Sequence, residues 1–370
     1  QTEGWAAKVS VLFEPSDTVS FNLIADWSDT TGDCCARAVY TNTDGGVTRI
    51  LDAIGAAQGL PNTTLEYING GEFRTAVRNN GDLALRDKGL TLRSEFELGA
   101  GNLTSITAYR EWFSRNRNEQ ALFSTVDVLA FSPQFQSEQF SQELLYDVQV
   151  SDSIDAIFGA FYSDEDMLRE RTLFNGADAQ AFITALTTIP SGATPGTVIQ
   201  KEYIPGTAKS MSVFTNWTFD LTDKWTFAVG GRLSKEEKTG AYDNLIDPPA
   251  GSAWTLINVF PAPAFSDSYE EDAFSGAASL SYHLSRDATM FGKLSRGFKA
   301  GGVILDSTAA GSPATNPELG AGRVPLDPTY RSEFVNAYEL GGKFVYWDGR
   351  ASTNLSFFYN DIEDLQVPQF

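Results

Sequence analysis

Few residues in this sequence could support covalent chemistry. Among its 370 residues the only histidine is His283, which lies one residue before a predicted turn. The sequence contains no recognisable Ser-His-Asp or Cys-His arrangement, and no pair of carboxylates stands out as a general acid and base. Its glycine-rich stretches open loops rather than helices, so they do not predict phosphate cradles. The sequence therefore predicts a protein that is not an enzyme and that carries no cofactor.

The residues that could bind a metal or form a disulfide lie close together near the N-terminus. Asp26, Asp29 and Asp33 offer oxygen ligands suited to calcium, but their spacing lacks the glycine and glutamate of an EF-hand loop, so we expect no metal site. Cys34 and Cys35 are adjacent, and neighbouring Cα atoms about 3.8 Å apart fall below the usual disulfide range of about 4.4–6.8 Å. A strained vicinal disulfide, two reduced thiols, and a metal or redox role all remain open.

Composition narrows the class of protein. The net charge of −21 argues against binding nucleic acid through its phosphates. No run of about 18 apolar residues occurs, so the sequence predicts no transmembrane helix. A membrane is not excluded by this, because a spanning β-strand needs only about 9–11 alternating residues.

Alternation of apolar and polar residues predicts an all-β chain of about twelve strands in six hairpins. Each hairpin is closed by a short turn rich in Gly, Asp, Asn, Ser or Pro. The predicted strand pairs are residues 6–13 with 19–27, 89–98 with 102–114, 138–150 with 155–165, 210–221 with 225–235, 272–284 with 288–299, and 333–346 with 351–362.

Long connections separate these hairpins at residues 28–88, 115–137, 166–209, 236–271 and 300–332. Residues 48–59 and 178–188 within them have apolar spacings near three and four, which predict short helices. Most of the 15 prolines, Pro205 among them, fall in the long connections. Because proline cannot donate a hydrogen bond to a strand ladder, this distribution supports the strand boundaries.

The predicted strands, at about ten to fourteen residues, exceed the usual five or six and are long enough to cross a bilayer at a tilt. Leu90 and Leu92 lie on one strand face, and Thr91 and Arg93 lie on the other. A soluble sandwich buries such apolar faces, whereas a membrane barrel turns them toward lipid, so alternation does not separate the two. Strand length and one-sided long loops favour the barrel.

Aromatic residues near the short turns also favour the membrane barrel. Trp225 and Tyr282 lie next to turns, where a membrane-interface girdle is expected, and Phe158, Phe161 and Tyr162 lie further along the strands. The alternative is that aromatic residues are simply good strand formers.

Four segments resemble the TonB-dependent outer-membrane receptors: residues 89–112, 289–302, 334–343 (FVNAYELGGK) and 348–366 (DGRASTNLSFFYNDIEDLQ). The resemblance extends over essentially the whole chain. It implies a plugged transmembrane antiparallel barrel of about 22 strands in a meander, with long extracellular loops. Residues 1–370 are then one partial barrel domain, and we expect the plug and the remaining strands to lie outside it.

The resemblance also implies function and partners. It predicts active, TonB-coupled uptake of a siderophore-iron complex, or of a similar large scarce solute, across the outer membrane of a Gram-negative bacterium. The expected partners are outer-membrane lipid and lipopolysaccharide, the TonB complex acting through an N-terminal segment, and a small-molecule ligand. A passive porin-like channel and, less favoured, a soluble β-sandwich protein are the alternatives.

Candidate substrate-binding residues follow from the resemblance together with side-chain chemistry. Aromatic rings stack on flat chelators, and basic groups bind anionic ones. The same basic residues could instead bind lipopolysaccharide phosphates or neutralise nearby carboxylates. The candidates are Tyr109, Arg110, Trp112, Arg115 and Arg117, with Lys293 and Lys299 as a second group.

Overall fold

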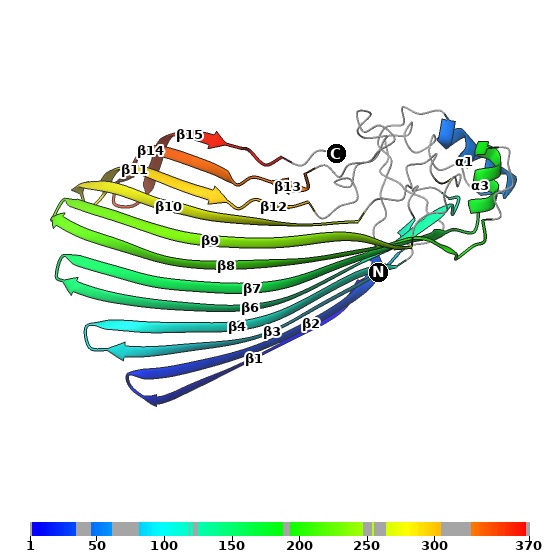
Figure 1. Cartoon of the computed structure of the whole chain (residues 1–370). Helices are drawn as coiled ribbons and strands as arrows, with labels where there is room; N and C mark the ends of the chain where they lie inside the picture. The colour runs from blue at the N-terminus through cyan, green and yellow to red at the C-terminus, as the bar shows by residue number, and fades with distance from the viewer. Residues whose placement is uncertain are drawn as a thin grey trace.

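One curved antiparallel sheet makes up most of the molecule (Figure 1). The structure, a computed structural model, describes residues 2–34, 46–60, 81–117, 119–120, 125–187, 193–246, 254, 264–304 and 327–367. Long strands that are consecutive in the chain are neighbours in the sheet, in the order β1-β2-β3-β4-β6-β7-β8-β9-β10-β11-β14-β15. This up-and-down order is the predicted meander.

The elements have the following bounds. The long strands are β1 (Thr2–Ser16), β2 (Val19–Cys34), β3 (Gly81–Leu98), β4 (Gly101–Arg117), β6 (Leu129–Ser151), β7 (Ile154–Asn175), β8 (Val198–Thr222), β9 (Trp225–Ile246), β10 (Phe265–Ser285), β11 (Ala288–Lys299), β14 (Glu333–Tyr346) and β15 (Ala351–Glu363). The shorter elements are α1 (Gly46–Ala57), α3 (Ala179–Thr187), β5 (Glu119–Gln120), β12 (Gly302–Val303) and β13 (Thr329–Tyr330). No helix in the described part of the chain combines the length and hydrophobicity needed to cross a membrane.

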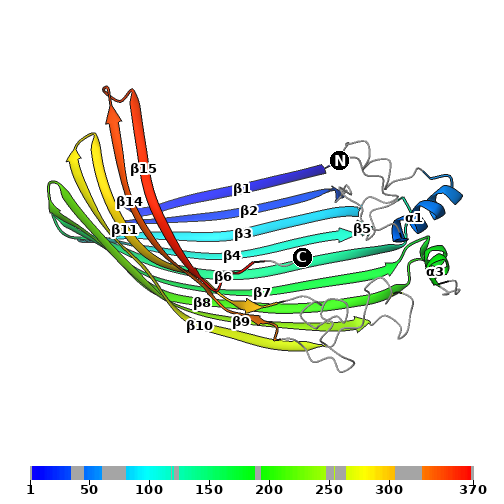
Figure 2. The same ribbon diagram turned by 90° about the horizontal axis from the view of Figure 1, so that it is seen from above.

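The six predicted hairpins are confirmed, as are both predicted helices. Figure 2 shows the tight turns at one end of the sheet and the helices α1 and α3 at the other. In the last turn Trp347 and Asp348 have φ of 53° and Gly349 has φ of 86°. Asp and Gly suit this left-handed backbone, which explains why an Asp-Gly pair marks the turn in the sequence.

The long strands from β1 to β10 are longer than predicted at the end away from the tight turns, whereas β11 and β14 have the predicted bounds. β8 has 25 residues and begins at Val198, although the predicted strand begins at residue 210. Pro205 therefore lies inside β8, and its assignment to a long connection is wrong. The pairing of β8 with β9 skips Ile204 and Pro205, so the missing N–H of proline leaves no gap in the ladder there.

The sheet is open along two edges. Within the described residues β1 pairs only with β2 and β15 pairs only with β14, so the strands form a trough (Figure 2). An unpaired strand edge is not stable in hydrocarbon, because its N–H and C=O groups have no water to bond. In a membrane these two edges require further strands to pair with.

The strand register gives the sheet an apolar face and a polar face. Val213, Leu233 and Phe274 are cross-strand neighbours on the apolar face, with exposed fractions of 58%, 61% and 52%. Ser212 and Ser234 are neighbours on the polar face. A soluble sandwich would bury its apolar faces against each other, but the described strands form one layer with the apolar face exposed.

Aromatic rings gather on the apolar face near the tight turns. The ring centroids of Trp225 and Tyr282 are 4.5 Å apart, and those of Phe158 and Trp217 are 5.5 Å apart. Phe161, expected to lie with Phe158, projects instead from the polar face, because it pairs with Ser212.

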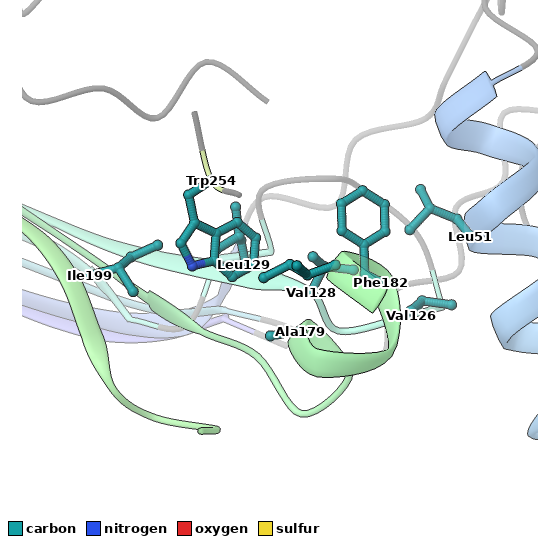
Figure 3. Packing of buried hydrophobic residues seen from close by; sticks show 9 residues of the cluster. Leu51, Val126, Val128, Leu129, Ala179, Phe182, Ile199 and Trp254 are labelled. Carbon is teal, nitrogen blue, oxygen red and sulfur yellow. The ribbon is translucent and has the colours of Figure 1, made fainter. Parts of the chain in front are cut away.

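The buried apolar cluster, which we call the loop core, lies beyond the outer ends of the strands and includes Leu129 and Ile199 at the ends of β6 and β8 (Figure 3). Figure 3 shows Leu51 of α1, Phe182 of α3 and Trp254 around the same interior. The core thus joins segments of four long connections. Its members are Leu51, Val126, Val128, Leu129, Ala179, Phe182, Ile183, Ile199 and Trp254.

Asp178 ties the loop core together with hydrogen bonds. It lies directly before α3, where an aspartate favours helix initiation. Its carboxylate accepts hydrogen bonds from Gln58 Nε2 at 2.7 Å and from the backbone N–H of Asp127 at 2.9 Å. One short polar side chain therefore links the α1 segment, the segment before β6 and the start of α3.

We predict that Phe182→Ala will loosen the loop core without unfolding the sheet. Phe182 has no exposed surface, and removing a buried phenylalanine side chain costs about 3–5 kcal/mol. Limited proteolysis of the full-length protein should show faster cleavage near α1 and α3. The matched control is Phe357→Ala, because Phe357 is 68% exposed. Equal cleavage of Phe182→Ala and wild type would show that this core does not hold the loops.

Candidate functional site

The best candidate site is a hollow of about 570 Å³ on the polar face, toward the end of the sheet that carries the long connections. We call it the rim hollow. It combines apolar, aromatic and charged side chains from five neighbouring strands, β3, β4, β6, β7 and β8. Its lining residues are Asp87, Arg110, Trp112, Phe135, Gln136, Ser137, Gln139, Glu165, Met167, Leu168, Arg169 and Ile204.

Two aromatic rings and an arginine form one wall of the rim hollow. Trp112 pairs with Ser137 in the register of β4 and β6. Phe135 precedes Ser137 by two residues and so lies on the same face, and its ring centroid is 6.5 Å from that of Trp112. Arg169 on β7 pairs with Phe135, and its guanidinium carbon lies 5.4 Å from the ring centroid. Such a cation–π contact holds the guanidinium against the ring face.

Arg110 is held at the edge of the rim hollow by carboxylates of two neighbouring strands. Its guanidinium forms ion pairs with Asp87 and, at 3.1 Å, with Asp26. Gly89 makes room for this arrangement, because a Cβ there would lie 2.9 Å from Arg110 Nη2. The side chain of Arg110 remains 47% exposed, so its charge is shared with the two aspartates but is still accessible to solvent.

The structure divides the first group of candidate residues between the two faces. Arg110 and Trp112 lie on the polar face, whereas Tyr109, Arg115 and Arg117 lie on the opposite side of β4. The Tyr109 hydroxyl donates to Glu111 at 3.2 Å and lies 3.3 Å from Glu138. Successive residues of a strand point to opposite faces, so closeness in sequence does not bring the five together.

Lys293 and Lys299 both lie on the polar face, but on β11, far along the sheet from the rim hollow. Lys293 lines a separate hollow of about 300 Å³ together with Glu339 and Phe358. Lys299 pairs with Glu333 in the register of β11 and β14. The structure therefore keeps the second group of candidates apart from the first.

The possible metal and disulfide residues are only partly described. Asp26 and Asp29 lie on opposite faces of β2, the first paired with Arg110 and the second with Arg86 at 3.1 Å. Cys34 ends β2, but Cys35 lies outside the described residues, so the disulfide stays a prediction. Within the described ranges no group of three or more His, Cys, Asp or Glu residues is placed to hold a metal ion.

Only Arg110 and Trp112 of the lining residues were predicted as candidates, and Arg169 and Ile204 are among those that sequence reasoning missed. Arg169 and Ile204 both fall in residues 166–209, which the sequence assigns to a long connection. The sequence carries no alternation signal for this extension, because neighbouring residues share polarity: Glu165 and Asp166 are acidic, Met167 and Leu168 are apolar, and Arg169 is followed by another charged residue.

Comparison with known proteins decides the family. Residues 16–370 match the family described as TonB dependent receptor-like, beta-barrel. The chain belongs to this family. Its sheet is thus part of the transmembrane barrel of a TonB-dependent receptor, with the apolar face toward lipid and the polar face toward the interior. No curated protein matches the chain in sequence.

Solved receptor structures have the same fold. FyuA, the ferric yersiniabactin uptake receptor from Yersinia pestis, is 14% identical with a TM-score of 0.69, over 99% of this chain and 46% of FyuA. The siderophore receptor PiuA from Acinetobacter baumannii is 14% identical with a TM-score of 0.60, over 96% of this chain and 49% of PiuA. The copper transporter OprC is 10% identical with a TM-score of 0.61, over 98% of this chain and 46% of OprC. The chain spans about half the length of these structures.

We predict opposite environments for adjacent residues Leu294 and Lys293. Spin labels would be placed at Leu294→Cys and Lys293→Cys, each with Cys34 and Cys35 replaced by serine, in receptor reconstituted in bilayers. Oxygen concentrates in hydrocarbon and a nickel complex stays in water, so the label at position 294 should collide mainly with oxygen. The label at position 293 should show much less contact with oxygen. Equal oxygen contact at both positions would contradict the assignment of the faces.

Proposed function

We propose that this chain forms the wall of an outer-membrane receptor that imports an iron chelate by TonB-coupled transport. The observation that carries the proposal is the rim hollow, in which aromatic rings and arginines line the interior face of the barrel. This combination suits a flat ligand with negative charge, because rings stack on its faces and guanidinium groups bind its oxygens. Ferric siderophores have this chemistry.

The nature of the hollow favours a chelate over a bare metal ion. A bare ion is held by a compact set of ligands such as His, Cys or carboxylates. In the described parts of the chain no such group of three is present. Similar structures include both a ferric yersiniabactin receptor, FyuA, and a copper transporter, OprC, so this distinction rests on the side chains of this chain.

The remaining parts of the proposal follow from family membership. The receptor would lie in the outer membrane of a Gram-negative bacterium, in contact with lipid and lipopolysaccharide on its apolar face. TonB would act on a segment of the whole protein outside these strands. The barrel would bind and pass its ligand without covalent chemistry and without a resident cofactor.

We predict that Trp112→Ala will weaken binding of an anionic ferric chelate by at least about tenfold, or about 1.4 kcal/mol, because the ligand loses an aromatic ring on which it stacks. Binding of radiolabelled ferric citrate and a ferric tris-catecholate to cells expressing the full-length receptor would measure this. Tyr109→Ala is the matched control, because Tyr109 lies on the same strand but on the opposite face. Its affinity should stay within about twofold of wild type, below the effect of a hot-spot residue.

The reverse pattern would contradict the site. If Tyr109→Ala abolished binding and Trp112→Ala did not, the ligand would be bound outside the rim hollow. Growth of a receptor-deletion strain under iron limitation, with single chelates added back, would identify the substrate. If uptake of every iron chelate were normal and another nutrient failed, the substrate class would be wrong.

Energy dependence separates active import from the passive-channel alternative. We expect a protonophore to abolish uptake of the chelate while leaving its binding to the cell surface unchanged, because the inner-membrane motor draws on the proton gradient. Uptake and surface binding of the same radiolabelled chelate would be measured with and without the protonophore. Uptake that continues at the untreated rate would favour the passive channel.

A further inference from the structure

A second arginine–aromatic group lies deeper on the polar face, nearer the tight turns. Its members, which we call the inner cluster, are Phe161 on β7, Phe214 on β8 and Arg232 on β9. The guanidinium carbon of Arg232 lies 5.6 Å from the ring centroid of Phe161 and 5.2 Å from that of Phe214. The two rings thus hold one cation between them.

The sheet is shaped to accommodate this group. A Cβ at position 159 would lie only 2.1 Å from the Phe214 ring, so the ring fits because Gly159 lies beneath it. The adjoining polar-face positions carry the small residues Ser212 and Ser234, both buried. The rings and the guanidinium therefore lie among small residues on the polar face, which leave them room to pack against one another.

Arg232 has no acidic partner among the described residues, unlike three other arginines of the polar face. Arg93, Arg110 and Arg171 each form an ion pair with a carboxylate. For Arg232, the residues that the structure describes provide one hydrogen bond, from Nε to Ser234 Oγ at 3.3 Å, and no ion pair. The two terminal nitrogens of Arg232 have no hydrogen-bond partner among the described residues. The guanidinium edge that they form can therefore bind a carboxylate or similar anion through two parallel hydrogen bonds.

The inner cluster and the rim hollow share one strand. Glu165, Met167 and Arg169 of β7 line the rim hollow, and Phe161 lies on the same face four residues before Glu165. At about 3.3 Å per residue, Phe161 is roughly 13 Å further along the wall. A solute that leaves the rim hollow and moves through the barrel along β7 would reach the inner cluster next.

We propose that Phe161, Phe214 and Arg232 form a second binding station, which takes the planar anionic group of the imported chelate during its passage. The proposal rests on the proposed function and deepens it. The rings contact the flat part of the ligand, and the terminal nitrogens of Arg232 bind its anionic oxygens. The station acts on transport after capture, so it affects the uptake rate more than the affinity at the cell surface.

The test separates capture from passage in cells expressing the full-length receptor. Radiolabelled ferric citrate and a ferric tris-catecholate are bound to protonophore-treated cells, and their uptake is followed in energised cells. For Arg232→Ala and Phe214→Ala we expect surface affinity within about twofold of wild type and an initial uptake rate reduced by about tenfold. Arg232→Lys should give an intermediate rate, because lysine keeps the charge but lacks the planar fork.

The control variant is Arg93→Ala, which removes an arginine of the same face that already has a carboxylate partner, Glu95. Its uptake should match wild type. The amount of folded receptor at the surface is measured for each variant, and Arg232→Lys guards against loss of folding in the alanine variants. Wild-type uptake by Arg232→Ala at an equal surface amount would overturn the second station and leave the proposed function intact.

Two other outcomes would also overturn the second station. If Arg232→Ala admitted a large unrelated solute such as vancomycin while binding and uptake of the chelate were unchanged, Arg232 would hold a segment that fills the barrel. If the wild-type receptor neither bound nor imported any anionic ferric chelate, the proposed function and the second station would both fail.

Discussion

Hydrogen bonding of the backbone within a bilayer is the constraint on which the rest of this structure depends. Every N–H and C=O in hydrocarbon must be bonded to a neighbouring strand, so the chain forms long antiparallel ladders in an unbroken meander. Once the ladder is fixed, so is the face to which each side chain points, and a shift of one residue would reverse them all. Function must therefore be built from alternate residues of several strands.

This constraint explains why closeness in sequence is a poor guide to the site. Arg110 and Trp112 project into the interior, whereas Tyr109 and Arg115 project from the outer face of the same strand. The partners of Trp112 come instead from β6 and β7, where Phe135 and Arg169 occupy matching positions. The register supplies these partners, and it depends on pairings that no single strand encodes.

The sequence allowed the hairpins, the tight turns and the two helices to be predicted, because alternation, Asp-Gly turns and helical spacing are local signals. It did not allow the outer ends of the strands to be placed. Pro205 looked like a loop residue, but it is tolerated in β8 where pairing with β9 is interrupted. Phe161 looked like a girdle residue because its ring has the right chemistry, but it lies three residues after Phe158 and therefore on the opposite face of β7. Arg169 was missed because it, like Pro205, falls in residues 166–209, which the sequence assigned to a long connection but which the structure shows to be partly strand.

The loop core gives the rim hollow its rigidity. β6, β7 and β8 provide Phe135, Arg169 and Ile204 to the hollow, and at their outer ends β6 and β8 provide Leu129 and Ile199 to the loop core. The strand segments that carry the binding residues are therefore fixed on one side by the sheet and on the other by packed loops. A preformed site loses less conformational entropy when a ligand binds, so its affinity is greater for the same contacts. A packed core among the loops thus favours capture of a scarce solute, even though no residue of that core lines the hollow.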